Sequence, residues 1–303
     1  MGTIGLISAL GRTAAELYRL RTPPEAYARM ASPTHRLRRS LFGVFIAASA
    51  CSATHAAEPL QMRVESEIFV DRDAEPVARS LTVFRDGLAW DFLDGAEPGR
   101  TVEIVLHDPA RERVVVIDPD RNVKTEIDRL RLERLSASLA AWARRSDDKL
   151  MLWAGGPTFH EHIRKQDRTL ELSGPRARYI VEFAAAPTPE AAETYRRFAD
   201  TALLLKSLLH PGGMPPFPRL AINEQVAAAA AIPESVTLEI DARSPLLGGR
   251  SQTLRSVHKV YPRLLSSDLE RVEDAEARVA VAVAVDVATY AEPKAAAPFT
   301  AAK

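Results

Sequence analysis

Residues 83–92 read VFRDGLAWDF, and this stretch decides the fold. Two largely apolar runs, Ser80–Phe84 and Leu88–Leu93, flank Arg85-Asp86-Gly87. Glycine readily adopts the positive φ angle that a tight turn between antiparallel strands requires. The stretch therefore predicts a β-hairpin, from which the rest of a sheet extends in both directions.

The alternation of apolar and polar residues continues on both sides of this hairpin. Val102, Ile104 and Leu106 share one face of the next segment, as in a half-buried strand. Turns rich in Asp, Pro and Gly separate the runs, and loops this short join antiparallel neighbours. We therefore expect antiparallel strands at residues 61–70, 80–84, 88–93, 101–107, 113–117 and 123–127.

Helix-like and strand-like patterns alternate in the second half of the chain. Leucines and Trp142 recur every three or four residues, and Thr188-Pro189-Glu190 is typical of a helix start. The Val–Ala alternation of residues 279–287 favours a strand, although the same residues would also extend the preceding helix. The patterns predict helices at 128–143, 188–209, 219–231 and 267–278, and strands at 149–153, 158–163, 169–172, 178–183, 236–240, 252–261 and 279–287.

The predicted fold class is therefore α+β, with a curved antiparallel sheet packed on helices and partly covered by them. The composition agrees with a globular protein, since 46% of the 303 residues are hydrophobic and 26% are charged. The 40 Lys and Arg balance 40 Asp and Glu, but residues 1–57 hold seven arginines and two acidic residues. The remainder is mildly acidic, which disfavours nucleic acid as a partner.

A signal for export precedes the predicted sheet. Arg36-Leu37-Arg38-Arg39 is basic, residues 41–50 are apolar, and small residues follow through residue 57. This order is typical of a secretory signal peptide, and the apolar run is too short to span a bilayer. The sequence therefore predicts a periplasmic or secreted protein with no transmembrane segment in its mature chain.

Two routes of processing remain open. Cleavage after Ala56 or Ala57 would leave a mature chain without cysteine, whereas lipidation of Cys51 would anchor the protein to a membrane. Translation starts at Met1 or at Met30, which would give a signal peptide of ordinary length. The predicted organisation is an N-terminal extension and signal peptide at 1–57, a single domain at 58–290 and a disordered tail at 291–303.

His160 and His162 form the most metal-like pair in the sequence, because alternate residues of a strand share a face. A third ligand would have to be His107 or His258, which the sequence does not place nearby. Gly-x-Ser-x-Gly motifs and glycine-rich phosphate loops are absent from the sequence. We expect a non-enzymatic protein without a cofactor, and a metal-assisted hydrolase using His160 and His162 is an alternative.

Aromatic residues are spread along the predicted sheet and helices. A sheet curved around helices either fills its concave side with such residues or leaves a cavity there. The predicted cavity-lining, ligand-binding residues are Trp90, Phe92, Trp153, Tyr179, Phe183 and Phe198.

Residues 62–127 resemble the lipoprotein carriers of the LolA and LolB type. The resemblance rests on VFRDGLAWDF at 83–92, on IVLHDP at 104–109 and on the strand that follows. The Pro215-Pro216-Phe217 stretch after a helix is also similar to a group of exported bacterial proteins with no assigned activity. The resemblance implies a strongly curved sheet that wraps around helices covering an apolar cavity, and it transfers no functional residues.

The resemblance implies an exported, non-enzymatic carrier or binding protein with an apolar concave site. Its ligand would be a lipid, an acyl chain or a lipoprotein. An alternative is a structural or protein-interaction factor of the cell envelope, with a packed core and no ligand.

Overall fold

The computed structural model describes residues 60–95, 99–164, 168–210, 213–241 and 251–292, with the backbone alone for 161–164. The hairpin at 83–92 is confirmed: Asp86 and Gly87 turn the chain with φ angles of 53° and 76°. The predicted meander is confirmed as well. Its strands are β1 (Met62–Val70), β2 (Ala78–Arg85), β3 (Leu88–Asp94), β4 (Thr101–Asp108), β5 (Arg113–Asp118) and β6 (Val123–Asp128).

The second half of the chain completes the sheet and supplies the helices. The strands are β7 (His160–Arg164), β8 (Thr169–Ser173), β9 (Ala177–Ala185), β10 (Ala231–Ile240), β11 (Gln252–Tyr261) and β12 (Val283–Ala284). The helices are α2 (Arg129–Ala143), α3 (Lys149–Ala154), α4 (Pro189–Leu209), α5 (Phe217–Ala228), α6 (Ser266–Val281) and α7 (Val287–Tyr290), with a short 3₁₀ turn at Pro109–Arg111.

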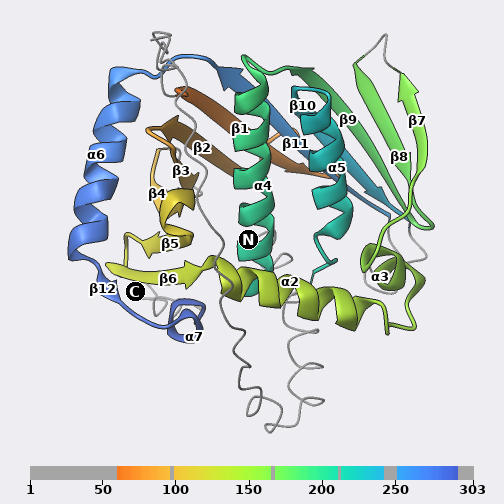
Figure 1. Ribbon diagram of the computed structural model, residues 1–303, viewed down its shortest axis with the longest axis horizontal. Helices are drawn as coiled ribbons and strands as arrows, with labels where there is room; N and C mark the ends of the chain where they lie inside the picture. Colours follow the sequence, from red (N-terminus) through yellow and green to blue (C-terminus); the bar gives the residue numbers. More distant parts are fainter. Residues whose placement is uncertain (1–59, 96–98, 165–167, 211–212, 242–250, 293–303) are drawn as a thin grey trace, which may run out of the picture.

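All twelve strands described belong to one sheet, in the order β12-β6-β5-β4-β3-β2-β1-β11-β10-β9-β8-β7. Strand β1 joins the two halves, because it pairs with β2 on one side and with β11 on the other. Neighbouring strands are antiparallel except β12 and β6, which are parallel. The predicted fold class is therefore confirmed: the protein is α+β, with a large curved, mostly antiparallel sheet and helices packed on it (Figure 1).

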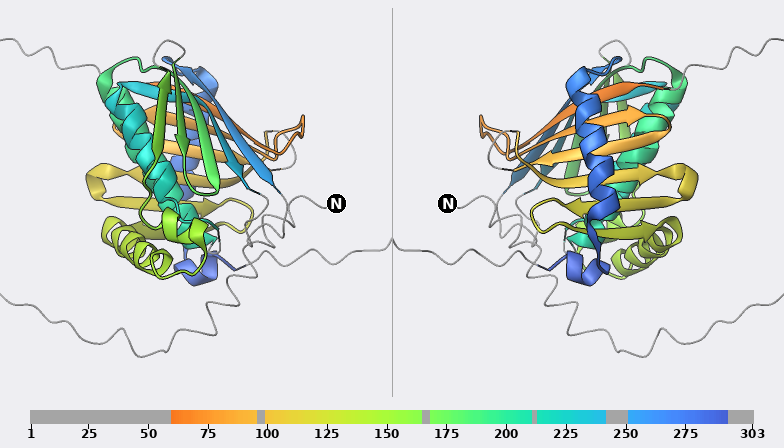
Figure 2. Two further views of the ribbon diagram at one scale, coloured as in Figure 1. Left: turned by 90° about the vertical axis from the view of Figure 1, so that its right-hand side faces the viewer. Right: turned by 90° about the vertical axis from the view of Figure 1, so that its left-hand side faces the viewer.

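Helices α4 and α5 cover one face of the sheet, here called the inner face (Figures 1 and 2). Tyr195 and Phe198 of α4 pack on Met62, Val64 and Phe84 of β1 and β2. Farther along α4, Leu205 and Leu209 reach the inner face of β4, β5 and β6, where α2 and α7 also pack. The inner face is thus apolar at both of these places, and the helices remove it from water there.

The opposite face, called the outer face, is covered on one half of the sheet. Val272 and Ala275 of α6 pack on the Trp90 and Phe92 side of β3 and on the same side of β2, β4 and β5. Beyond α6, the outer face of β1, β11, β10, β9 and β8 presents charged side chains, including the ion pair of Arg178 with Glu171. Both faces of β3, β4 and β5 are therefore buried, which explains continuous apolar runs such as Val114–Ile117.

Two sequence predictions need correction. The strand expected at 149–153 is wrong, because Lys149–Ala154 forms helix α3. Asp148 caps that helix by accepting hydrogen bonds from the backbone N–H groups of Leu150 and Met151, and a short apolar run does not distinguish a buried helix from a strand. The strand expected at 279–287 shrinks to β12, because α6 continues through Val281 and α7 begins at Val287.

The predicted leader at 1–57, with Cys51 and the cleavage sites, lies outside the described residues, as does the tail from 293 onward. These predictions stay predictions. Within the described part of the chain, none of the helices has both the length and the apolar character needed to cross a membrane.

Candidate functional site

The six aromatic residues predicted to line a cavity lie in three separate places. Trp90 and Phe92 face α6 on the outer side of the sheet. Trp153 and Tyr179 belong to the apolar cluster under α5, and Phe183 packs against its margin. Phe198 lies in α4 against Phe84, with ring centroids 5.5 Å apart. The structure therefore brings together some of these residues on the inner face and separates Trp90 and Phe92 from them.

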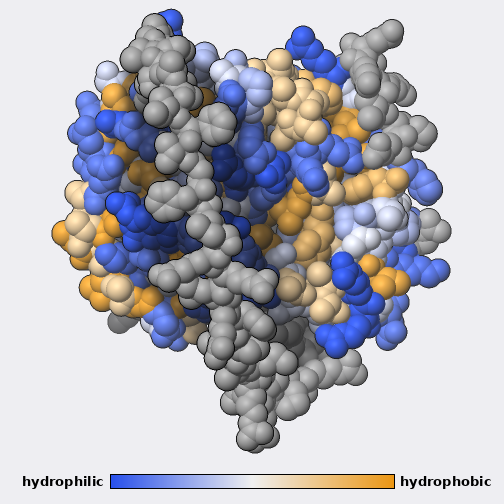
Figure 3. Space-filling view, in the orientation of Figure 1, coloured by the Kyte–Doolittle hydropathy of each residue, from blue (hydrophilic) through white to orange (hydrophobic). Residues whose placement is uncertain are grey.

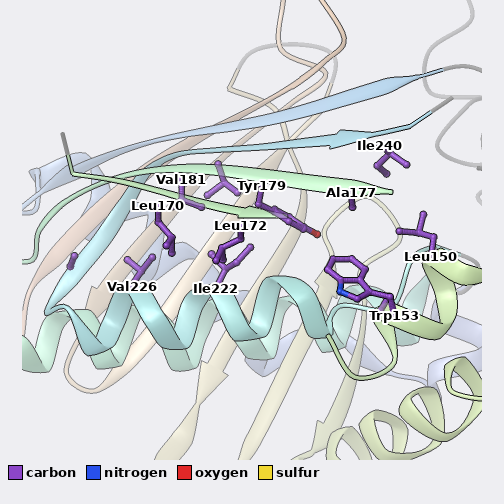
Figure 4. Close-up of a cluster of buried hydrophobic side chains, with 13 residues drawn as sticks. Leu150, Trp153, Leu170, Leu172, Ala177, Tyr179, Val181, Ile222, Val226 and Ile240 are labelled. Atoms are coloured by element: carbon purple, nitrogen blue, oxygen red, sulfur yellow. The ribbon is translucent and has the colours of Figure 1, made fainter. Parts of the chain in front are cut away.

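Side chains of α5 pack tightly on the inner face of β8, β9 and β10 (Figure 4). Ile222 and Val226 project from α5 toward Leu170, Leu172 and Val181 on the strands. The space between α5 and the strands is filled by this apolar cluster.

Next to this apolar cluster lies a polar one, formed where α4 and α5 meet the sheet. Four of its members interact electrostatically with the guanidinium of one arginine on the first turn of α5, and Asn223 joins them through its hydrogen bond to Asp200. The cluster consists of Arg219 and Asn223 from α5, Tyr195 and Asp200 from α4, Tyr179 from β9 and His258 from β11.

Asp200 is the acidic member of this cluster, and both of its oxygens are occupied. Oδ1 accepts a 2.8 Å hydrogen bond from Nδ2 of Asn223, and Oδ2 accepts one of 2.8 Å from Nη1 of Arg196. Burial raises the pKa of Asp200, and the hydrogen bond from Asn223 and the charge of Arg196 oppose that rise. Arg196 is shared between two carboxylates, since it also donates two hydrogen bonds to Glu193.

Arg219 is the cation of the cluster, and its hydrogen bonding is incomplete. Its Nη1 atom is buried and has no hydrogen-bond partner among the described residues. The Oδ1 atom of Asn223, one helical turn away on the same face of α5, is equally buried and unpartnered there. Burial lowers the pKa of Arg219, since a charge in an apolar interface loses its hydration. An unmatched buried donor or acceptor costs about 1–3 kcal/mol, more when it is charged.

His258 is the neutral member of the cluster. Its Nδ1 lies 2.9 Å from Oγ of Ser66 across the β1–β11 pair, and its Nε2 lies 3.0 Å from Oγ of Ser256. Burial, reinforced by the positive charge of Arg219, lowers the pKa of His258 to about 3. At neutral pH the imidazole is therefore uncharged and does not repel Arg219.

Two tyrosines of the cluster and one aspartate near it also have shifted pKa values. Burial raises the pKa of Tyr195 to about 12 and also raises that of Tyr179, so both phenols keep their protons at neutral pH. On β3, burial raises the pKa of Asp91 to about 6 in spite of hydrogen bonds from Thr82 and Ser80. At neutral pH the carboxyl of Asp91 is therefore mostly ionised, whereas the two phenols and His258 are uncharged.

The third ligands considered for a metal site at His160 and His162 lie far from β7. His160 is exposed on β7, at one edge of the sheet, and the side chain of His162 lies outside the described residues. His258 is on β11, with β8, β9 and β10 between it and β7, a separation of roughly 19 Å at about 4.8 Å per strand. His107 on β4 is farther still. Among described residues, the model forms no group of three or more His, Cys, Asp or Glu placed to hold a metal.

Sequence reasoning did not find Arg219, Asn223 and His258 as a site. One signal was present, because Arg219, Ile222, Asn223 and Val226 follow the three- and four-residue spacing of the buried face of a helix. Polar residues inside such a face are candidates for a buried site. The histidine comes from a strand about 35 residues away, and no local pattern links it to α5.

Two open pockets lie on the outer face. One of about 260 Å³ lies beside α6, between Arg63, Lys259 and Arg271, with Glu65, Glu67 and Asp94 among its other walls. The second, of about 440 Å³, lies over β9, β10 and β11. Most of the arginines there are already engaged, since Arg63 pairs with Glu65 and Arg271 lies 2.9 Å from Asp94. These pockets are mixed in charge and do not match an apolar ligand.

Comparisons with known proteins give a similar solved structure and no assigned activity. No family model matches the sequence, and no curated protein sequence matches it. The LolA superfamily protein NE2245 from Nitrosomonas europaea, a crystal structure, is similar with 10% identity and a TM-score of 0.25. The similarity covers 69% of this chain and 88% of that one. A similarity of this size does not assign an activity.

Proposed function

We propose that this chain is an exported, non-enzymatic binding protein that takes up an apolar ligand between α4–α5 and the inner face of the sheet. The ligand class is a lipid, an acyl chain or the acylated end of a lipoprotein, and the protein acts in the periplasm or outside the cell. Lipidation of Cys51 would hold it at a membrane, whereas cleavage after Ala56 or Ala57 would release it.

One observation carries this proposal. The interface between α5 and the sheet is apolar, yet it buries Nη1 of Arg219 and Oδ1 of Asn223 without hydrogen-bond partners among the described residues. Buried polar groups in a completed core are nearly always hydrogen-bonded. Apolar walls with a few unmatched polar groups are typical of a ligand site. On this side of the molecule, hydrophobic residues gather beside α5 (Figure 3).

A second candidate function is a structural or protein-interaction role in the cell envelope, with no ligand. The tight packing of Ile222 and Val226 on Leu170 and Leu172 favours it, because this cluster fills the space under α5 (Figure 4). In that case the inner face is a fully packed core without a ligand. The unpartnered polar atoms of α5 then only lower the stability of the folded protein.

Native mass spectrometry of the processed protein, purified without detergent, separates the two functions. A co-purified lipid, or binding of added dodecanoate or 1-dodecanol, supports the binding protein, and absence of all three supports the structural role. Val226 is 2% exposed and lies on the face of α5 that packs on the sheet. Val226→Phe should weaken binding of dodecanoate and 1-dodecanol, because the larger side chain occupies space that the ligand needs. Val281→Phe is the matched control, since Val281 is 69% exposed at the end of α6.

A further inference from the structure

We infer that the ligand of the inner face carries an anionic head group, a carboxylate or a phosphate, and that Arg219 binds it. This inference rests on the proposed function and specifies the chemistry of its ligand. The structure supports it in three steps: the charge around Arg219, the atoms left without partners, and the direction of the apolar wall.

No carboxylate among the described residues is hydrogen-bonded to Nη1 of Arg219. Asp200 is the carboxylate that acts on it, but that carboxylate is bonded to Arg196 at 2.8 Å and to Asn223 at 2.8 Å. His258 and the two phenols are uncharged at neutral pH. Asp91 accepts a 2.7 Å hydrogen bond from Thr82 and acts electrostatically on Tyr195. These carboxylates thus bond other partners, and Nη1 of Arg219 keeps a donor for an anionic group that the described residues do not supply.

The unmatched atom is of the kind that binds an oxyanion. Nη1 of Arg219 is a donor, and it is buried beside the hydroxyl-bearing rings of α4 and β9. A guanidinium matches the geometry of a carboxylate or phosphate with two parallel N–H···O bonds, and such charge-assisted bonds are about twice as strong as neutral ones. A neutral hydroxyl head group would accept a hydrogen bond from Nη1, but that bond would not be charge-assisted on both sides.

The buried apolar residues of α5 come directly after Arg219 on the same face of the helix. Ile222 and Val226 follow Arg219 along the same face of α5, and the seven residue steps from 219 to 226 span roughly 10 Å at about 1.5 Å per step. Figure 4 shows both side chains directed at the apolar residues of β8 and β9. A head group at Arg219 would thus direct a ligand's hydrocarbon chain along α5, displacing side chains that now fill the space.

Three probes test this inference on the processed protein: dodecanoate, which has a chain and a charge, 1-dodecanol, which has only the chain, and acetate, which has only the charge. Binding is measured by calorimetry at pH 8, below the aggregation concentration of each amphiphile. We expect dodecanoate to bind roughly tenfold or more tightly than 1-dodecanol, the ratio that one charge-assisted bond supplies, and acetate to show no measurable binding.

Arg219→Met should remove this preference and make dodecanoate bind as weakly as 1-dodecanol. Arg134→Met, which removes an exposed arginine of α2, is the matched control and should keep the preference. The comparison of the three probes on the unmodified protein does not depend on either variant folding.

The outcomes separate the two proposals. Equal affinity for dodecanoate and 1-dodecanol overturns the anionic head group and leaves the apolar binding function in place. Binding of neither amphiphile overturns the proposed function and the inference with it. Acetate bound as tightly as dodecanoate identifies a site for a free anion and overturns the amphiphile. A preference for dodecanoate that survives Arg219→Met assigns the head group to another residue and overturns the role of Arg219.

Discussion

The hydroxyl of Thr82 donates a 2.7 Å hydrogen bond to the carboxylate of Asp91, across the β2–β3 pair on the inner face of the sheet. This bond favours the charged carboxylate, yet burial has the larger effect and raises the pKa of Asp91 from 3.8 to about 6. The folded protein therefore binds a proton at Asp91 more tightly than the unfolded chain does. Stability linked to this group is present below about pH 4 and is lost as the pH rises to about 6.

Asp91→Asn should abolish that loss, because an amide does not ionise. The free energy of unfolding of the variant, relative to the unmodified protein, should rise by on the order of 2–3 kcal/mol between pH 4 and pH 7. Urea denaturation at each pH unit measures this difference. Parallel stability curves for the two proteins over that range would show that Asp91 titrates normally.

His258 should act in the opposite direction. Its folded pKa of about 3 lies below its ordinary value of 6.5, so the unfolded chain binds the extra proton between these pH values. Stability linked to this group rises with pH from about 3 to 6.5, by at most about 1.4 kcal/mol per unit. His258→Gln keeps a hydrogen-bonding side chain beside Ser66 and Ser256 and should flatten the curve below pH 6.5. An unchanged acid slope in urea denaturation would contradict the shift.

Gly174 is required where β8 ends against Trp153. A Cβ atom at residue 174 would lie 2.4 Å from the indole ring, which packs edge-to-face on Phe159 at 5.3 Å between ring centroids. Gly174→Ala should therefore destabilise the protein by about 1–3 kcal/mol and shift the tryptophan emission to longer wavelength. Gly213→Ala is the control, because a Cβ there meets nothing within 4 Å. Equal stability of both variants would contradict the close approach.

Arg121 ties the β5–β6 turn to the C-terminal helix α7. Its Nε donates to Asp118 at 2.8 Å, and its Nη2 donates to the backbone oxygen of Tyr290 at 2.6 Å. Arg121→Met should cost about 1–3 kcal/mol, because the buried carboxylate of Asp118 loses this partner. Limited proteolysis should then cut faster near residue 286. Arg100→Met, which removes an exposed pair with Asp120, should change stability by less than about 0.5 kcal/mol.

The meander could be predicted from sequence because its signals are local. Gly87 and the Asp- and Pro-containing turns mark the hairpins, and the alternation of apolar and polar residues marks the strands between them. The segment at 149–153 was mispredicted because an apolar run is ambiguous without its cap, Asp148. Trp90 and Phe92 were grouped with Phe198 because the sequence does not show that helices cover both faces of β3. The polar cluster depends on α5 meeting β9 and β11, which only the assembled sheet brings together.

The pairing of β1 with β11 joins segments about 190 residues apart, and β12 reaches β6 only when the last helices are in place. Two sub-sheets, β1–β6 and β7–β10, can therefore form from nearby segments, but the whole structure has to wait for the C-terminal part of the chain. Because a chain is synthesised from its N-terminus, the edge of β6 stays unpaired until the last residues of the sheet are available. An unpaired strand edge is open to wrong pairing during that interval.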